Sequence, residues 1–539
     1  MPARRRLISL SRLPQAAWAA ALACVLASGP AMAQRAPFVA RVKPAAAVEP
    51  AAQTPATLRG VVTLDPRLLL QLVVSRSAEI EYSKMQIEVS GQLSKAEAAL
   101  YELVFYTALR KDGGPRQRTV EERITSPSTS KLTVLHEQVT SAESGVKWRL
   151  PTGADMSASY RMRQRTNNII ASASTSDTEY DGALIMSFKQ PLLKGFGRAV
   201  TETDMRVAAD EQEIALWQYR QQMMKTCNDA LGVYWQLYRA IEVKKIRDQA
   251  LDYGRQVAVD TAARIRAGKL PSSNMIEAQA AVLLREVEQI RAEQGVREAE
   301  SRLQTLLAIS GLADSGLQLV VRDDIRFDRI DVGTAAERYR RALDTWPALR
   351  IARLRAEQAG FRLNYAANQT LPSLDLVLMR TNTGLSTSAR EARQLTDDAK
   401  YREWSIGLNF EMPLGGGQKA RAHYNAQEAR VRQAQIEVDA IHTALGNDIR
   451  SKWEQAIGGR DEASRMGEDV SLRSEILRIE KVRYDSGLTL LSQLLQREAE
   501  LSESRLRLLE SNARLGQAND ALLFADGTLL QHYGITVKE

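Results

Sequence analysis

The longest stretch of this sequence without a proline constrains the fold most strongly. No proline occurs between Pro191 and Pro271, so residues 200–266 can form one uninterrupted helix. Such a helix is on the order of 100 Å long, which no compact domain can enclose. It must therefore pack sideways against other long helices. Its apolar residues recur at spacings of three and four, as on one face of a helix: Leu216, Tyr219, Met223, Cys227, Ala230, Tyr234, Leu237 and Ile241.

A second proline-free run covers residues 419–484 and carries a similar stripe, with Trp453 in the place of Trp235. Each run ends near a glycine, Gly268 or Gly487, and a shorter helical pattern follows. We therefore predict long helices at 199–267 and 419–486 and return helices at 271–309 and 489–525.

Two segments of alternating apolar and polar residues precede each long helix. Alternation is typical of a strand with unlike faces. We predict one β-hairpin within residues 146–190 and another within 373–413, which gives four strands of about ten residues each. Residues 111–150 are polar and contain glycine and serine; their structure stays open, and they leave room for extra strands. The apolar positions are Met156, Ala158, Tyr160, Met162; Tyr180, Gly182, Leu184, Met186, Phe188; Leu374, Leu376, Leu378; and Trp404, Ile406, Leu408, Phe410, Met412.

The order of these elements occurs twice along the chain. We interpret residues 64–332 and 333–539 as two repeats, each with a helix, a hairpin, a long helix and a return helix. The first repeat closes with a small mixed segment at 311–332. The predicted hinges between strand and long helix are Pro191, Gly195 and Gly197 in the first repeat, and Pro413 and Gly415 in the second.

The N-terminus has the pattern of a secretory signal peptide. Basic residues precede the apolar run Ala16–Ala27, and Ala31-Met32-Ala33 is a small-x-small cleavage motif. This predicts a signal peptide at 1–33, cleaved between Ala33 and Gln34, followed by a flexible Ala- and Pro-rich tether at 34–63. A membrane anchor is disfavoured because the apolar run is too short to span a bilayer. A lipoprotein site at Cys24 is disfavoured because the apolar run continues past it.

Removal of the leader lowers the formal net charge from +8 to +4, because the leader holds four arginines and no acids. No cluster of Lys and Arg remains that would predict a nucleic-acid partner. Cys227 is then the one cysteine left, so an intramolecular disulfide is excluded.

Known catalytic patterns find little support in the sequence. The histidines His136, His423, His442 and His532 lack metal-ligand spacing. Gly195-Phe196-Gly197 has no third glycine in register for a phosphate loop, and no hydrolase or metalloprotease motif occurs. We predict a protein that is not an enzyme and that binds no cofactor or metal.

The four predicted strands could cross a membrane only as part of a closed β-barrel. After the leader, no stretch of 18 apolar residues appears that could form a spanning helix. Strands of this length can cross a tilted bilayer, but four cannot close a barrel, and open edges in lipid leave backbone groups unpaired. Membrane strands therefore imply several copies, and three copies would give twelve strands. The alternative is a soluble β-patch that caps a helical bundle.

The segment Lys189-Gln190-Pro191-Leu192-Leu193-Lys194-Gly195-Phe196-Gly197 ends a strand and opens a long helix. It resembles the same segment of the TolC-type outer-membrane efflux proteins, as do Arg483-Tyr484-x-x-Gly487-Leu488 and Arg264-Ile265-x-x-Gly268. The resemblance covers the chain from about residue 64. It implies a mainly α fold with membrane β-structure: a homotrimer whose twelve-stranded barrel in outer-membrane lipid continues as a helical barrel into the periplasm. Such channels bind a periplasmic adaptor and an inner-membrane pump.

The resemblance also implies two kinds of site near the glycine turns. The adaptor-contact candidates are Gly268, Leu270, Gly487, Leu488 and Leu491, with Thr489 beside them. The gate candidates are Tyr484, Asn274, Gln493 and Thr489. Asn274, Gln493 and Thr489 stand where the family has charged residues, so we expect a lock of neutral hydrogen bonds, with Asp485 and Arg266 as solvated charges.

The function expected from these observations is a passive, trimeric exit duct of a tripartite efflux pump or a type I secretion system. It would lie in the outer membrane with a periplasmic extension. The alternative is a periplasmic coiled-coil adaptor or scaffold protein. The cargo stays open between drugs, metals, polysaccharides and proteins.

Overall fold

The computed structural model describes residues 61–124, 131–173, 176–306, 318–321 and 332–535. The predicted signal peptide, its cleavage site and most of the predicted tether lie outside these ranges. The end of the predicted tether is instead strand β1 (Val61–Leu64), which pairs in parallel with β6 (Gln318–Val321) from the predicted mixed segment. Residues 307–317 and 322–331 of the return helix and mixed segment are outside the description.

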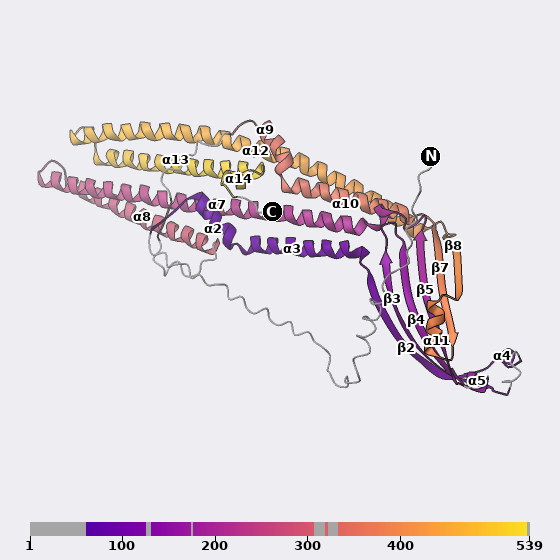
Figure 1. Cartoon of the computed structure of the whole chain (residues 1–539). Helices are drawn as coiled ribbons and strands as arrows, with labels where there is room; N and C mark the ends of the chain where they lie inside the picture. The colour runs from indigo at the N-terminus through magenta and orange to yellow at the C-terminus, as the bar shows by residue number, and fades with distance from the viewer. Residues whose placement is uncertain (1–60, 125–130, 174–175, 307–317, 322–331, 536–539) are drawn as a thin grey trace, which may run out of the picture. The chain divides into compact units, whose positions relative to one another are not determined.

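The first long helix is α7 (Thr203–Arg266), an unbroken helix of 64 residues that follows the short α6 (Arg198–Thr201). Its predicted stripe faces inward, since Met223, Cys227, Ala230, Tyr234 and Leu237 are all buried. Helix α8 (Ser273–Leu306) turns back along α7 (Figure 1).

The second long helix is α12 (Gln418–Asp485), with 68 residues, and α13 (Leu491–Ala525) turns back along it (Figure 1). The short α14 (Leu529–His532) follows. The buried positions Leu445, Ile449 and Ala456 of α12 belong to its predicted stripe. None of the described helices is long and apolar enough to span a membrane.

Shorter helices precede the strands in both halves of the chain. The predicted first helix is divided into α2 (Pro66–Arg76) and α3 (Ala78–Ala98), because Ser77 has an extended backbone (φ −69°, ψ 119°). The 3₁₀ turn η1 (Ala99–Tyr101) ends it. Trp346 makes the same break (φ −77°, ψ 114°) between α9 (Ala335–Thr345) and α10 (Pro347–Gln369). The extended backbone before Pro347 is what its ring requires.

The sheet has six strands in the described residues, which corrects the prediction of four. Its antiparallel order is β2-β3-β4-β5-β7-β8. Of the two additional strands, β3 lies within residues 111–150, whose structure the sequence left open, and β2 begins before that stretch and ends within it. The bounds are β2 (Val104–Gln117), β3 (Val134–Arg149), β4 (Asp155–Asn167), β5 (Thr178–Pro191), β7 (Ser373–Ser386) and β8 (Tyr401–Glu411).

The register gives the sheet one apolar and one polar face. Trp148, Met156, Phe188, Leu378 and Ile406 are cross-strand neighbours in a row that runs from β3 to β8. The opposite face carries polar rows, in which Ser157 and Ser187 share a hydrogen bond of 2.8 Å. The strands extend from one end of the long helices, and the short α4 (Val120–Ile124) and α5 (Asn168–Ala173) lie at their far end (Figure 1).

Helix α11 (Ala389–Asp397) folds back across β5 and β7 on the apolar face (Figure 1). Two glycines make this approach possible. A Cβ at Gly384 would stand 2.2 Å from the Ala392 carbonyl oxygen, and one at Gly182 would stand 2.6 Å from the Thr396 hydroxyl. Ala392 and Thr396 are both fully buried there.

The largest core lies where α2, α7, α8, α13 and α14 meet. Trp235 of α7 packs against Gly516 of α13, where a Cβ would stand 2.4 Å from the indole ring. The indole Nε1 donates to Asp520 Oδ2 at 2.7 Å, and Tyr533 Oη donates to Asp520 Oδ1 at 2.7 Å. Burial raises the pKa of Asp520 to about 6 despite these donors.

The close contact of Trp235 with Gly516 predicts that Gly516→Ala destabilises the fold. The added methyl overpacks the core at a cost of about 1–3 kcal/mol, partly offset by a gain of up to about 1 kcal/mol in helix propensity. Gly232→Ala on α7 is the matched control, because a Cβ there meets no atom within 4 Å. Thermal unfolding of the purified variants should lower the Tm for Gly516→Ala alone. Equal shifts in both variants would contradict the packing account.

Candidate functional site

The ends of the two long helices farthest from the sheet form the candidate site. Both use the same capping motif. The Gly268 N–H donates to Ile265 O and the next N–H to Arg264 O, each at 2.9 Å. The Gly487 N–H donates to Tyr484 O at 3.0 Å and the next N–H to Arg483 O at 2.9 Å. Both glycines have positive φ, +66° and +74°, which favours glycine at this position.

An apolar cluster lies directly behind these turns. Tyr484 and Leu491 of the second helix pair pack with Val257 and Ala278 of the first, and Leu270 packs against them. Leu491 is 1 % exposed, so it supports the turn from inside and does not fit the predicted role of an adaptor contact. Leu488 is 72 % exposed at the tip and keeps that role as a proposal.

A charged contact joins the two long helices at this level. Arg264 Nη2 lies 2.6 Å from Asp485 Oδ1, and Arg264 Nη1 donates to Tyr484 O at 3.2 Å. The same guanidinium lies 4.7 Å from the centroid of the Tyr484 ring. The Asp485 side chain is 51 % exposed, in keeping with the predicted solvated charge, but it also pairs with Arg264, a partner that was not predicted. Arg266, the other predicted solvated charge, is exposed and donates to Ala262 O on its own helix.

The predicted neutral partners do not reach across between helices. The Thr489 hydroxyl donates to Gln493 Oε1 at 2.5 Å, a bond within the α12–α13 turn. Asn274 is half-buried at the start of α8, and its side chain has no hydrogen-bond partner among the described residues. Of the predicted gate set, only Tyr484 lies between the two helix pairs.

A second ion pair lies deeper between the helix pairs, and the sequence reading missed it. Arg285 of α8 reaches Glu498 of α13, and their side chains are only 9 % and 8 % exposed. The arginine passes over Gly254 of α7, where a Cβ would stand 3.0 Å from its Cδ. Tyr253 lies beside the pair, and burial, reinforced by the Glu498 charge, raises its pKa. The pair is therefore buried where α7, α8 and α13 meet.

The sequence does contain a signal for this pair. The buried residues of α8 include Ala278, Arg285, Ala292 and Ala299 at intervals of seven, so a charge interrupts a stripe of alanines. Glu498 interrupts a stripe of leucines on α13 in the same way. A charge at an apolar stripe position predicts a buried partner of opposite sign, because an unpaired buried charge is strongly destabilising.

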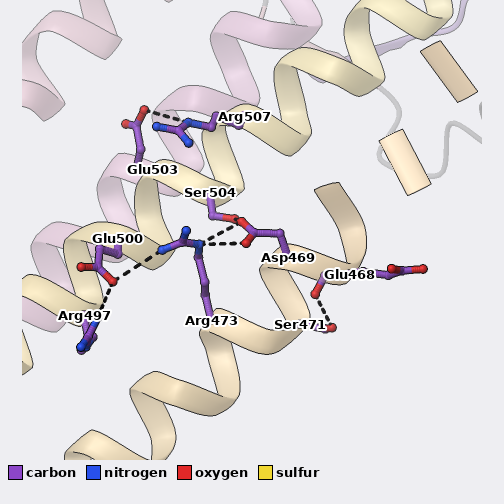
Figure 2. Close-up of polar contacts among 9 residues, drawn as sticks. All are labelled: Glu468, Asp469, Ser471, Arg473, Arg497, Glu500, Glu503, Ser504 and Arg507. Carbon is purple, nitrogen blue, oxygen red and sulfur yellow. Dashed lines mark hydrogen bonds and ion pairs between the residues drawn. The ribbon is translucent and has the colours of Figure 1, made fainter. Parts of the chain in front are cut away.

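A larger polar network joins α12 to α13 above the turn (Figure 2). Arg473 Nε lies 2.9 Å from Asp469 Oδ2, and Arg473 Nη1 lies 3.5 Å from Glu500 Oε2. Ser504 donates to Asp469 Oδ2 at 2.5 Å, and Arg497 donates to Glu500 Oε2 at 2.9 Å. The Ser504 hydroxyl and then Arg473 lower the pKa of Asp469, and Arg497 lowers that of Glu500. The network therefore holds α12 and α13 together.

The predicted hinges lie at the opposite end, between strands and long helices. Pro191 ends β5, and Gly195 and Gly197 follow with φ of +84° and +98°. The Gly195 N–H donates to Asn368 Oδ1 at 2.6 Å, which ties this hinge to the end of α10. In the second half, positive φ occurs at Gly416 and Gly417, not at the predicted Gly415 that follows Pro413.

No group of His, Cys, Asp and Glu within the described ranges is arranged to hold a metal ion. His442, one of the four histidines, instead bonds the Tyr339 hydroxyl at 2.9 Å.

Comparison with known proteins agrees with this architecture. Residues 339–528 match the family model "Outer membrane efflux protein". The outer membrane efflux protein BepC of Brucella suis biovar 1 is 21% identical over 405 residues, which cover 72% of this chain and 82% of BepC.

Solved structures share the fold. A membrane protein from Pseudomonas aeruginosa superimposes with a TM-score of 0.61 at 16% identity, over 87% of this chain and 92% of that one. The CmeC outer membrane channel of Campylobacter jejuni gives a TM-score of 0.59 at 12% identity, over 86% of each chain. The predicted resemblance to the outer-membrane efflux proteins is thus confirmed.

The Arg285–Glu498 pair predicts a large loss of stability when it is broken on one side. Glu498→Gln leaves a buried guanidinium without its counter-charge, which should cost about 3–5 kcal/mol. The double variant Arg285→Met with Glu498→Leu removes both charges and should recover most of that loss. Thermal or denaturant unfolding of the purified protein measures both. A double variant as unstable as Glu498→Gln would show that packing, and not charge pairing, dominates.

The network in Figure 2 predicts that its contribution to the stability of the fold depends on pH only in the acidic range. Because the folded-state pKa of Asp469 and of Glu500 is lowered, their stabilisation is present above the unfolded values of about 4 and is lost as pH falls further. Asp469→Asn should therefore lower the Tm at pH 7. Below pH 4, the Tm of the variant should decrease less steeply with falling pH than that of the unaltered protein. An equal offset at every pH would argue against the network.

Proposed function

We propose that this relative of outer membrane efflux channels is the passive exit duct of a tripartite efflux pump or a type I secretion system. Three copies would form the channel. The sheet of each copy would cross the outer membrane, and the helices would extend into the periplasm.

One observation carries this proposal: the sheet combines an exposed apolar face with open edges at the end of long helices. On its last strand, Trp404, Ile406, Leu408 and Phe410 are between 61 % and 75 % exposed. Large apolar side chains in such an array are typical of a surface that meets lipid or another chain. The polar opposite face suits a water-filled lumen.

The helices suit a periplasmic tunnel. The 64 residues of α7 and the 68 of α12 extend on the order of 100 Å from the sheet. Leu488, Leu270 and the two capping glycines at their tips are the proposed contacts with a periplasmic adaptor, which would link the duct to an inner-membrane pump. Energy for transport would come from that pump.

We place the gate at the two ion pairs that join α7–α8 to α12–α13. Opening the tip separates these helix pairs, so it must break the Arg264–Asp485 contact near the end and strain Arg285–Glu498 behind it. The outer pair is partly exposed, with side chains 28 % and 51 % accessible, so it contributes about 1 kcal/mol or less. Arg264 and Asp485 thus form the labile contact, and the buried pair acts as the pivot.

A periplasmic adaptor or scaffold is the second candidate, favoured by the paired long helices alone. An adaptor has one helical hairpin flanked by small β-domains. The described residues form two helical hairpins and a continuous six-stranded sheet, besides the small β1–β6 pair, which supports the channel instead.

Envelope fractionation tests the duct. The full-length protein, expressed with its leader, should partition with outer membranes. It should also run as a β-rich oligomer that dissociates on heating. A stable monomer in the soluble fraction, with no affinity for detergent, would overturn the proposal.

The gate predicts that Asp485→Asn favours the open state. Loss of about 1 kcal/mol across the contact corresponds to roughly a fivefold change in the ratio of open to closed channels. Single-channel recording in planar bilayers measures that ratio. Glu475→Gln is the matched control, because Glu475 pairs with Arg478 on its own helix at 2.6 Å and contacts no other charged residue among those the structure describes. Equal behaviour of the two variants would remove Asp485 from the gate.

A further inference from the structure

The sheet ends at two edges that have no strand partner among the described residues, β2 and β8. β2 runs away from the long helices and β8 runs back toward them (Figure 1). The number of strands is even and every pair between them is antiparallel. When copies are related by rotation about an axis along the helices, β8 of one copy is therefore antiparallel to β2 of the next.

The two edges also match in their faces. The register places Phe105 and Leu109 of β2 on the same face of the sheet as Trp404 and Ile406 of β8. Leu109 is 80 % exposed and Trp404 75 % exposed. Pairing between copies would continue the apolar face on one side and the polar face on the other. A shift of the β2–β8 register by one residue would place the apolar side chains of one strand on the polar face. The match of faces therefore excludes such a shift.

The usable lengths agree as well. β2 has 14 residues, but Pro115 lies near its outer end and supplies no N–H for a ladder. The part before Pro115 is as long as β8, which has 11 residues. Both edges therefore offer the same length for pairing.

We infer that β2 of one copy pairs with β8 of the next, and that three copies close a barrel of eighteen strands instead of twelve. The inference rests on the proposed function for the trimer, and on the six-stranded sheet for the strand count. Barrel diameter grows roughly in proportion to strand number, so this barrel is about 1.5 times as wide as one of twelve strands. Barrels of 16–18 strands hold an open aqueous channel. The hairpin β2–β3 thus widens the outer exit.

Disulfide cross-linking in outer membranes tests the pairing. Ala108→Cys on the polar face of β2 is combined in turn with Ser405→Cys, Gly407→Cys and Asn409→Cys on the polar face of β8. Ser159→Cys on β4 is combined with the same three as the matched control, because β4 would be the edge of a twelve-stranded barrel. Cys227 is buried and stays unchanged in every variant.

Oxidation should give covalent dimers and trimers on non-reducing gels for at least one Ala108→Cys combination and for no Ser159→Cys combination. The reverse result would overturn the inference in favour of twelve strands. Absence of both cross-links in a preparation that is trimeric by native mass spectrometry would overturn it too. A monomer in that measurement would instead refute the proposed function, so the two failures are distinguishable.

Discussion

The sideways packing of α7 determines the arrangement of the other elements. One face of this helix is buried through Met223, Cys227, Tyr234 and Leu237, and no compact core could cover a stripe of that length. The chain covers it with helices from both halves: α2 and α8 from the first, and α13 from the second. The contact of Trp235 with α13 is close, since only a residue without a side chain fits opposite its indole at Gly516.

The elements with strong periodicity were predictable from the sequence. The two long helices begin and end within a few residues of their predicted bounds. A long run without proline that carries an apolar stripe at helical spacing is compatible with few structures other than a helix. Strands β4, β5, β7 and β8 were predicted from alternation. Strands β2 and β3 were not, because their signal is weak. Gly113, Gly114 and Pro115 interrupt the alternation in β2, and small residues such as Ala142 and Ser144 stand on the apolar face of β3.

The candidate site was predictable in place but not in chemistry. Gly268 and Gly487 marked the turns, and Tyr484 does lie between the helix pairs. The charged partners escaped prediction because an ion pair across helices depends on which faces meet, and local spacing does not contain that information. Arg264 and Asp485 are 221 residues apart in the chain. Even so, Arg285 and Glu498 each interrupt an apolar stripe of their helix, and that position in the sequence indicates a buried partner of opposite charge.

The two halves of the chain contribute unequally to the sheet: β2 to β5 come from the first half and only β7 and β8 from the second. Each half nevertheless supplies one long helix and one return helix. In a ring of three copies, the helical hairpins would be evenly spaced. The strands above them would alternate between groups of four and groups of two. In that ring the junctions would have to absorb this mismatch, and they hold paired glycines of positive φ, Gly195 with Gly197 and Gly416 with Gly417. The ring would be threefold at its outer rim and close to sixfold at its tip, with the change of symmetry taken up at these four residues.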